Sequence, residues 1–154
     1  MTVWTPSQSV TVKVLGLAWR GEELLVSEVE DSSGTINGVR PLGGCVEFGE
    51  TREQALIREF QEELDSAITL SGPWYAFENL FEHEGATGHE YLFVANVWLG
   101  DPAIYERNRF QYHETEEMVC WAAWMDPTRL PSGMALYPLA LLDQIIAGRV
   151  GPPN

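Results

Sequence analysis

Basic residues are scarce in this sequence: nine lysines and arginines stand against 23 aspartates and glutamates, which gives a formal net charge of -14 at pH 7. A chain of this charge repels a phosphate backbone or an anionic lipid surface unless cations lie between them. We therefore expect no direct binding to nucleic acids or membranes. A small anionic substrate would need a metal ion to offset the repulsion.

Cysteines and long apolar runs are scarce as well. Cys45 and Cys120 are too few for a disulfide framework, and no Cys and His cluster has the spacing of a zinc site. Residues 1–8 contain no basic stretch, and Pro138 and Asp143 interrupt the longest apolar stretch near the C-terminus. We expect neither a signal peptide nor a membrane span, and the cytoplasm as the location.

The residues that are present favour a folded domain. Of the 154 residues, 45% are hydrophobic, and six Trp, six Phe and five Tyr supply large side chains for a core. A chain of this length suits one domain, which we expect to span residues 1–154.

The order of apolar and polar segments predicts strands mixed with two main helices. Residues 10–19 and 24–29 alternate as a β-hairpin does. Turn signals at residues 31–34 and 37–38 precede an expected glycine-rich loop over residues 41–49. Further elements are expected as strands over 67–81, 89–99 and 118–124, a short helical segment capped at Asp101, and a final helix from Pro138 to about residue 147. Without regular βαβ alternation, this order indicates an α+β sandwich.

A helix is predicted to begin at Thr51. The segment Thr51-Arg52-Glu53-Gln54 matches a capping box, in which the Thr hydroxyl and the Gln side chain satisfy exposed backbone N–H groups. At about 100° per residue, one side of this helix is apolar and another is acidic. The apolar side comprises Leu56, Ile57, Phe60 and Leu64, and the acidic side Glu59, Glu62 and Glu63.

The acidic side of this helix is the part of the sequence that suggests chemistry. Glu59, Glu62 and Glu63 project from one helical turn, where each like-charged pair costs about 0.2–0.5 kcal/mol on an exposed helix. A hard divalent cation reverses the sign of that interaction, and Mg²⁺ or Mn²⁺ suits carboxylate oxygens together with substrate phosphates. The preceding glycine loop allows backbone groups to approach the ion. The implied reaction is hydrolysis of a phosphoanhydride.

These residues resemble the Nudix box, G-x5-E-x7-R-E-U-x-E-E-x-G-U, where U is a bulky apolar residue. Six of its seven strictly specified residues match, at Gly44, Glu50, Arg58, Glu59, Glu62 and Glu63, with Phe60 at the first U position. Two positions differ from the pattern: Asp65 stands where the family has Gly, and Ser66 where it has an apolar residue. Asp tolerates the left-handed backbone of a helix exit less well than Gly does.

The resemblance implies a Nudix fold, an α/β/α sandwich around a mixed, largely antiparallel sheet. It also implies hydrolysis of a nucleoside diphosphate linked to another moiety, such as a nucleoside triphosphate, a nucleotide sugar or ADP-ribose. By the same resemblance, the metal ligands are Glu59, Glu62, Glu63 and the carbonyl of Gly44. Arg58 positions a glutamate, and Glu50 supports the loop or the metal shell. The resemblance implies Mg²⁺ or Mn²⁺ as cofactor, and a homodimer is a further expectation.

Residues outside the box supply further candidates. Glu47 is a candidate for the metal or substrate shell, and Arg40 for a contact to a substrate phosphate through its planar guanidinium. A general base for the attacking water is sought among Glu114, Glu116 and Glu117, with Glu117 preferred; Glu90 and a Glu of the box itself are alternatives.

Two other functions compete with hydrolysis. One is a Nudix-like sensor that binds a nucleotide and hydrolyses nothing, which the change at Asp65 favours and the retained glutamates oppose. The other is an RNA-decapping pyrophosphatase, which the box permits and the acidic charge opposes.

Overall fold

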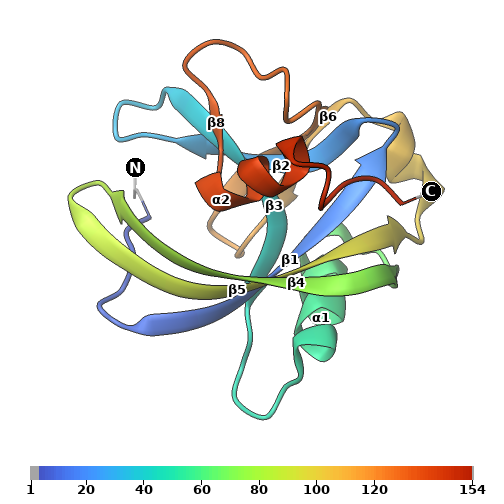
Figure 1. Ribbon diagram of the computed structural model, residues 1–154, viewed down its shortest axis with the longest axis horizontal. Coiled ribbons are helices and arrows are strands. Elements are labelled where there is room, and N and C mark those ends of the chain that lie inside the picture. Colours follow the sequence, from blue (N-terminus) through green and yellow to red (C-terminus); the bar gives the residue numbers. More distant parts are fainter. Residues whose placement is uncertain (1–3, 154) are drawn as a thin grey trace.

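The computed structural model describes residues 4–153 (Figure 1). Its elements, in chain order, are β1 (Val10–Arg20), β2 (Glu23–Glu30), β3 (Ile36–Cys45), α1 (Arg52–Leu64), β4 (Ile68–His83), β5 (Ala86–Leu99), the 3-10 helix η1 (Pro102–Glu106), β6 (Arg109–His113), β7 (Val119–Met125), β8 (Ala135–Leu136) and α2 (Leu139–Ile146). No helix among these residues is long and apolar enough to cross a membrane.

All eight strands join one sheet in the order β4-β5-β1-β3-β2-β7-β6, with β8 added to β3. Strand β1 runs parallel to β5, and β3 runs parallel to β8, while the other pairs are antiparallel. The sheet is therefore mixed and largely antiparallel, as predicted.

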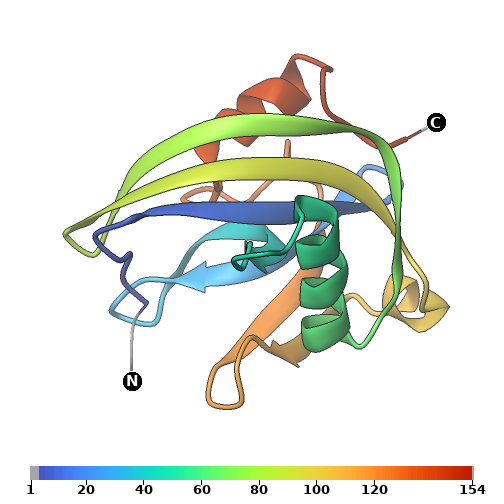
Figure 2. The same ribbon diagram turned by 90° about the horizontal axis from the view of Figure 1, so that it is seen from below.

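The two helices lie on opposite sides of the sheet (Figure 2). On β1, Val14 and Ala18 point into a core that includes Leu56 and Phe60 of α1. Leu15 and Leu17 of β1 belong instead to a second core, which includes Leu141 of α2. This alternation follows from the two-residue period of a strand. The expected α/β/α sandwich and the α+β class are confirmed.

Helix α1 begins as the capping box predicts. The backbone N–H of Gln54 donates to the Thr51 hydroxyl at 3.1 Å, and the backbone N–H of Thr51 donates to the Gln54 side chain at 2.9 Å. The helix sits directly on β1 because Gly16 has no side chain: a Cβ there would overlap the Phe60 ring. The cap and the close approach together fix where the acidic side of α1 lies.

The helix ends at Asp65, which adopts the left-handed conformation with φ 51° and ψ 42°. Its carboxylate accepts a hydrogen bond from the Gln61 side chain at 2.8 Å. Ser66 is buried, and its hydroxyl donates to the Ala67 carbonyl and accepts from the backbone N–H of Asp101. The two departures from the box are thus accommodated by local hydrogen bonds, and the helix exit keeps the backbone that the usual Gly provides.

Several predictions of local structure were wrong. Residues 41–45 belong to strand β3, so the expected loop is shorter, and the turn signal at Asn37 lies inside the same strand, where Gly38 pairs with both Val29 and Ala135. Ile57 is 42% exposed and does not join the core. Strand β6 was not predicted. Local signals failed here because pairing with neighbouring strands outweighed turn propensity.

Other predictions of local structure are confirmed. The hairpin between β1 and β2 forms, although only Trp19 and Arg20 of β1 pair with β2. Strands β4 and β5 pair antiparallel, with a register shift between Ser71 and Trp74 where the Gly72-Pro73 interruption was expected. The cap at Asp101 and the final helix also form.

Candidate active site

The acidic side of α1 faces the end of strand β3. Glu59 lies against Gly44, where an added Cβ would displace the Glu59 carboxylate from its present position. The Glu59 side chain is 14% exposed and that of Glu62 is 60% exposed. The three glutamates therefore range from covered to open, and the backbone of β3 lies beside the covered one.

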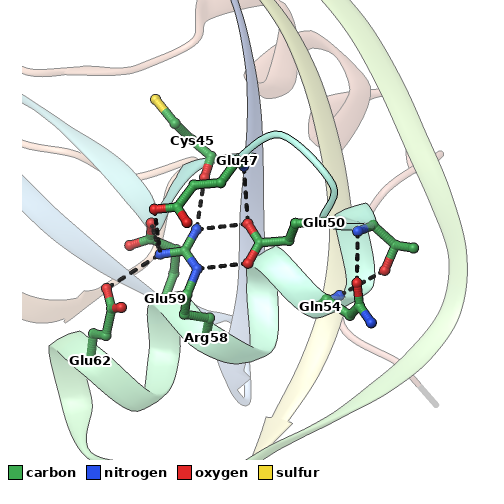
Figure 3. Close-up of polar contacts among 8 residues, drawn as sticks. Cys45, Glu47, Glu50, Gln54, Arg58, Glu59 and Glu62 are labelled. Atoms are coloured by element: carbon green, nitrogen blue, oxygen red, sulfur yellow. Dashed lines mark hydrogen bonds and ion pairs between the residues drawn. The ribbon is translucent and has the colours of Figure 1, made fainter.

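Arg58 organises the acidic residues around it (Figure 3). Its Nη1 donates to Glu59 at 3.0 Å and to Glu62 at 3.3 Å, and its Nη2 donates to the Cys45 carbonyl at 3.0 Å. The guanidinium thus ties α1 to the end of β3. Several carboxylates around it raise the pKa of Arg58, first through the hydrogen bonds to Glu50, so that its positive charge is fixed.

Glu50 anchors the loop between β3 and α1, residues 46–51. It accepts from Arg58 Nε at 2.7 Å and from Nη2 at 2.8 Å, and also from the backbone N–H of Glu47 at 3.0 Å. Hydrogen bonds from Arg58 lower the pKa of Glu50 from 4.5 to about 2. Glu50 is therefore an anion held in place, which suits a positioning role better than proton transfer.

Glu63 has the opposite character. Burial first, and then the negative charge of Glu59, raise the pKa of Glu63 from 4.5 to about 9, while Arg40 opposes the shift. Two carboxylates held together away from water favour the neutral form of one of them. A divalent cation would remove this penalty by pairing with both negative charges. The donor set therefore fits a hard metal ion.

No group of three or more His, Cys, Asp or Glu side chains within residues 4–153 is already arranged around a common metal position. Instead, Arg58 holds the carboxylates of Glu59 and Glu62 through the hydrogen bonds described above. Binding of a cation would require these side chains to change rotamer, while the capped helix keeps their backbone in place.

Two candidates outside α1 meet beside the cluster. Arg40 on β3 donates from Nη2 to Glu114 at 3.1 Å, and both groups act on the pKa of Glu63. Glu114 lies in the loop between β6 and β7. This loop borders an open depression of about 630 Å³, which is lined by Glu62, His113, Glu114, Thr115 and Glu116. The depression is acidic and lies beside Arg40 and the glutamates.

Glu47 and Glu117, the other two candidates outside α1, make weaker contacts or none with the glutamate cluster. Glu47 is exposed, and its carboxylate lies 3.9 Å from Arg58 Nη1, so it borders the cluster. Glu117 is exposed and makes no hydrogen bond or ion pair with the cluster among the described residues. The sequence alone could not show whether Glu114 or Glu117 contacts β3. The two residues are three positions apart in one loop, and the path of that loop decides which side chain turns toward β3.

Comparison with known proteins identifies the family. The family model of the NUDIX domain matches residues 10–143. An 8-oxo-dGTP diphosphatase of Haemophilus influenzae is 35% identical over 60 residues, which cover 39% of this chain and 43% of that protein. The match thus spans less than half of the relative's length.

Solved structures share the fold. The ORF135 protein of E. coli has a TM-score of 0.58 and 23% identity, with 92% of this chain and 91% of that chain covered. A NUDIX hydrolase from Nitrosomonas europaea has a TM-score of 0.58 and 24% identity, with 94% and 93% covered. The family model covers most of the sequence, from residue 10 to residue 143, and the chain therefore belongs to the NUDIX domain family.

Proposed function

We propose that this chain is a divalent-metal-dependent pyrophosphohydrolase that cleaves a phosphoanhydride bond in a nucleoside diphosphate derivative. The proposal rests chiefly on the cluster of Glu59, Glu62 and Glu63 on a capped helix, in which Arg58 holds Glu59 and Glu62, and the negative charge of Glu59 acts on Glu63. Membership of the NUDIX family supports the proposal, and so does the similarity to the H. influenzae 8-oxo-dGTP diphosphatase. Nucleoside triphosphates, nucleotide sugars and ADP-ribose are the proposed substrate classes.

The metal, Mg²⁺ or Mn²⁺, would be held by Glu59, Glu62 and Glu63 with the Gly44 carbonyl. When bound, it would neutralise phosphate charge and lower the pKa of a water molecule. The residues of the chain position the metal-binding carboxylates and the substrate. Glu50 fixes Arg58, and Arg58 keeps the glutamate-bearing turn beside β3. Arg40 and Glu47 face the substrate side in this proposal, where the Arg40 guanidinium would offer two N–H donors to a phosphate.

A general base comes from the loop between β6 and β7. The contact of Glu114 with Arg40 and its influence on Glu63 support Glu114 in this role. Glu117 stays a prediction from the sequence. Both carboxylates are within the same loop, so one pair of variants separates them.

The test is a panel of nucleotides with Mg²⁺ or Mn²⁺, read by phosphate release after phosphatase coupling. Glu63→Gln should abolish metal-dependent turnover, because the substitution removes one of the proposed metal-ligating carboxylates of the cluster. Glu53→Gln is the matched control, since Glu53 is exposed on the first turn of the same helix. Unchanged turnover in Glu63→Gln would refute the assignment.

The same panel, extended with capped RNA, tests the two competing functions. Tight nucleotide binding without turnover with either metal ion would favour the sensor, which the sequence suggests through Asp65 in place of the usual Gly. Release of a cap nucleotide from capped RNA would favour the decapping enzyme, which the net charge of -14 opposes.

The free cysteines Cys45 and Cys120 support a cytoplasmic location in this proposal. Homodimerisation stays a prediction.

A further inference from the structure

Arg40 projects from β3 to the same side of the sheet as Gly44, because side chains alternate along a strand and the two residues are an even number of positions apart. Gly44 lies beside Glu59. One helical turn further along α1, the charge of Glu63 acts on that of Arg40. The Arg40 side chain is only 29% exposed. Arg40 is thus a largely covered cation beside the acidic turn.

Glu114 lies where the open depression of about 630 Å³ comes closest to this cation. The loop between β6 and β7, which carries Glu114, projects beside α1 (Figure 2). Among the described residues, Glu114 lines the depression and Arg40 does not. The Glu114 carboxylate accepts from Arg40 Nη2 at 3.1 Å. A ligand in the depression therefore meets Glu114 before it meets Arg40.

Both oxygens of Glu114 accept hydrogen bonds from the protein. Oε1 accepts from Arg40, and Oε2 accepts from the Cys120 thiol at 3.7 Å. Burial raises the pKa of Cys120, so the thiol keeps its proton and stays a donor. In the resting protein, Glu114 is therefore held on Arg40 by one oxygen and on β7 by the other.

This pairing conflicts with the roles proposed above for its two members. A phosphate in the depression faces three acids, Glu62, Glu114 and Glu116. While Glu114 neutralises Arg40, little of the positive charge of Arg40 is left to offset them. A phosphate with two negative charges attracts a guanidinium more strongly than a single carboxylate does. The substrate and Glu114 therefore compete for the same cation.

We propose that a phosphate group of the substrate displaces Glu114 from Arg40, and that this exchange of partners both admits the diphosphate and frees Glu114 Oε1 for the attacking water. The proposal rests on the pyrophosphohydrolase function above. Cys120, the donor to Oε2, retains Glu114 beside the depression. Glu114 is thus a competitor of the substrate in the resting protein and the general base during turnover.

The first test measures binding of methylenediphosphonate, a diphosphate analogue that resists hydrolysis, in the presence of Mg²⁺ by isothermal titration calorimetry. Glu114→Gln should bind it at least about fivefold more tightly than the wild type, because Arg40 is released from a competing carboxylate. Arg40→Gln should weaken binding at least about tenfold. In the double variant, the gain from Glu114→Gln should fall below about twofold, because no Arg40 is left to release.

Glu28→Gln is the matched control, because it also removes one carboxylate from an arginine. Glu28 accepts from Arg109 Nε and Nη2 at 2.8 Å each. It pairs with Val39 on β3, the neighbour of Arg40, and therefore points to the opposite side of the sheet. Its binding should stay within about twofold of the wild type.

Three results of the titrations would overturn the proposal. One is binding to Glu114→Gln that is absent, weaker than in the wild type or equal to it. The second is an equal gain in Glu28→Gln, which would assign the effect to net charge. The third is a gain from Glu114→Gln that persists without Arg40, which would assign it to repulsion by Glu114 alone.

The second test uses the wild-type protein and needs no variant. A crystal structure with Mg²⁺ and methylenediphosphonate should show the Arg40 guanidinium donating to a phosphonate oxygen and Glu114 Oε1 turned away from Arg40. An Arg40–Glu114 ion pair that stays intact beside the bound diphosphonate would refute the exchange.

Turnover separates this inference from the function on which it rests. With a nucleotide that the panel shows to be hydrolysed, Glu114→Gln should lower KM at least about fivefold while kcat falls, whereas a merely disordered loop would raise KM. If Glu63→Gln abolishes turnover but Glu114→Gln does not lower KM, the pyrophosphohydrolase stands and the exchange is wrong. If Glu63→Gln leaves turnover intact, the pyrophosphohydrolase is wrong and the diphosphonate measurements still decide the exchange.

Discussion

Arg58 and Glu50 form a two-point ion pair, with Nε donating to Oε2 at 2.7 Å and Nη2 donating to Oε1 at 2.8 Å (Figure 3). Two parallel hydrogen bonds fix the plane of the guanidinium as well as its position. The remaining nitrogen, Nη1, is thereby directed at Glu59 and Glu62. One ion pair outside the acidic turn therefore sets the orientation of the residue that holds the acidic turn together.

The Arg58–Glu50 pair predicts a specific dependence of stability on pH. The folded-state pKa of Glu50 is about 2, below its ordinary value of 4.5, so its contribution is complete above about pH 4.5 and is lost as the pH falls toward 2. Glu50→Gln should lower the urea midpoint at neutral pH, and its difference from the wild type should shrink below about pH 4.5. Urea unfolding of both proteins from neutral pH down to about pH 2 measures this difference in midpoint. A difference that is constant with pH would contradict the role of the carboxylate.

The raised pKa of Glu63 predicts that this residue lowers the stability of the metal-free protein although activity requires it. Its folded-state pKa of about 9 lies above 4.5, so the metal-free protein loses stability as the pH rises between these values. Arg40 reduces this effect, whereas Glu59 and Glu114 increase it. Glu63→Gln should therefore unfold at least about 3 °C higher than the metal-free wild type near pH 8, while losing activity. Thermal unfolding by circular dichroism gives the measurement.

Added metal supplies the control for the Glu63 variant. Mn²⁺ should raise the unfolding temperature of the wild type more than that of Glu63→Gln, because only the wild type gains the cation at this acid. A variant that is less stable than the wild type without metal, at the same pH, would show that the Glu63 carboxylate is not under electrostatic strain.

The loop between β6 and β7 supplies a paired comparison. Glu114→Gln should reduce kcat at least about 100-fold if Glu114 is the general base, while Glu117→Gln should change kcat less than about threefold. The reason is that Glu114 contacts Arg40 and borders the depression beside Glu62, whereas Glu117 is exposed. Steady-state kinetics of the two variants decide the matter. The reverse ranking would restore the preference for Glu117 drawn from the sequence.

The left-handed backbone at Asp65 predicts that the protein would be more stable with glycine, the usual residue of the box, at this position. The backbone at Asp65 has φ 51°, a conformation that costs an L-residue roughly 1 kcal/mol relative to glycine. Asp65→Gly should raise the unfolding temperature by about 2–4 °C and leave kcat within about twofold. Asp65→Ala should lower the temperature instead, because alanine has neither the freedom of glycine nor the hydrogen bond from Gln61. A stabilising Ala variant would contradict the backbone argument.

The sequence by itself determined the parts of the site that depend on neighbouring residues. The capping box sets the start of α1, and the spacing of three and four residues sets Glu59, Glu62 and Glu63 on one side of it. Helical geometry alone connects these positions. The alternation in β1 and the antiparallel pairing of β4 with β5 follow from equally local patterns.

Only the tertiary structure decided which distant residues meet this helix. Strand β3 absorbs the start of the expected loop because β1 and β2 pair with it on both sides, and this places Gly44 against Glu59 and Arg40 beside Glu114. Such contacts depend on strand order and register, which are set by burial of the whole sheet and leave no mark in the local sequence.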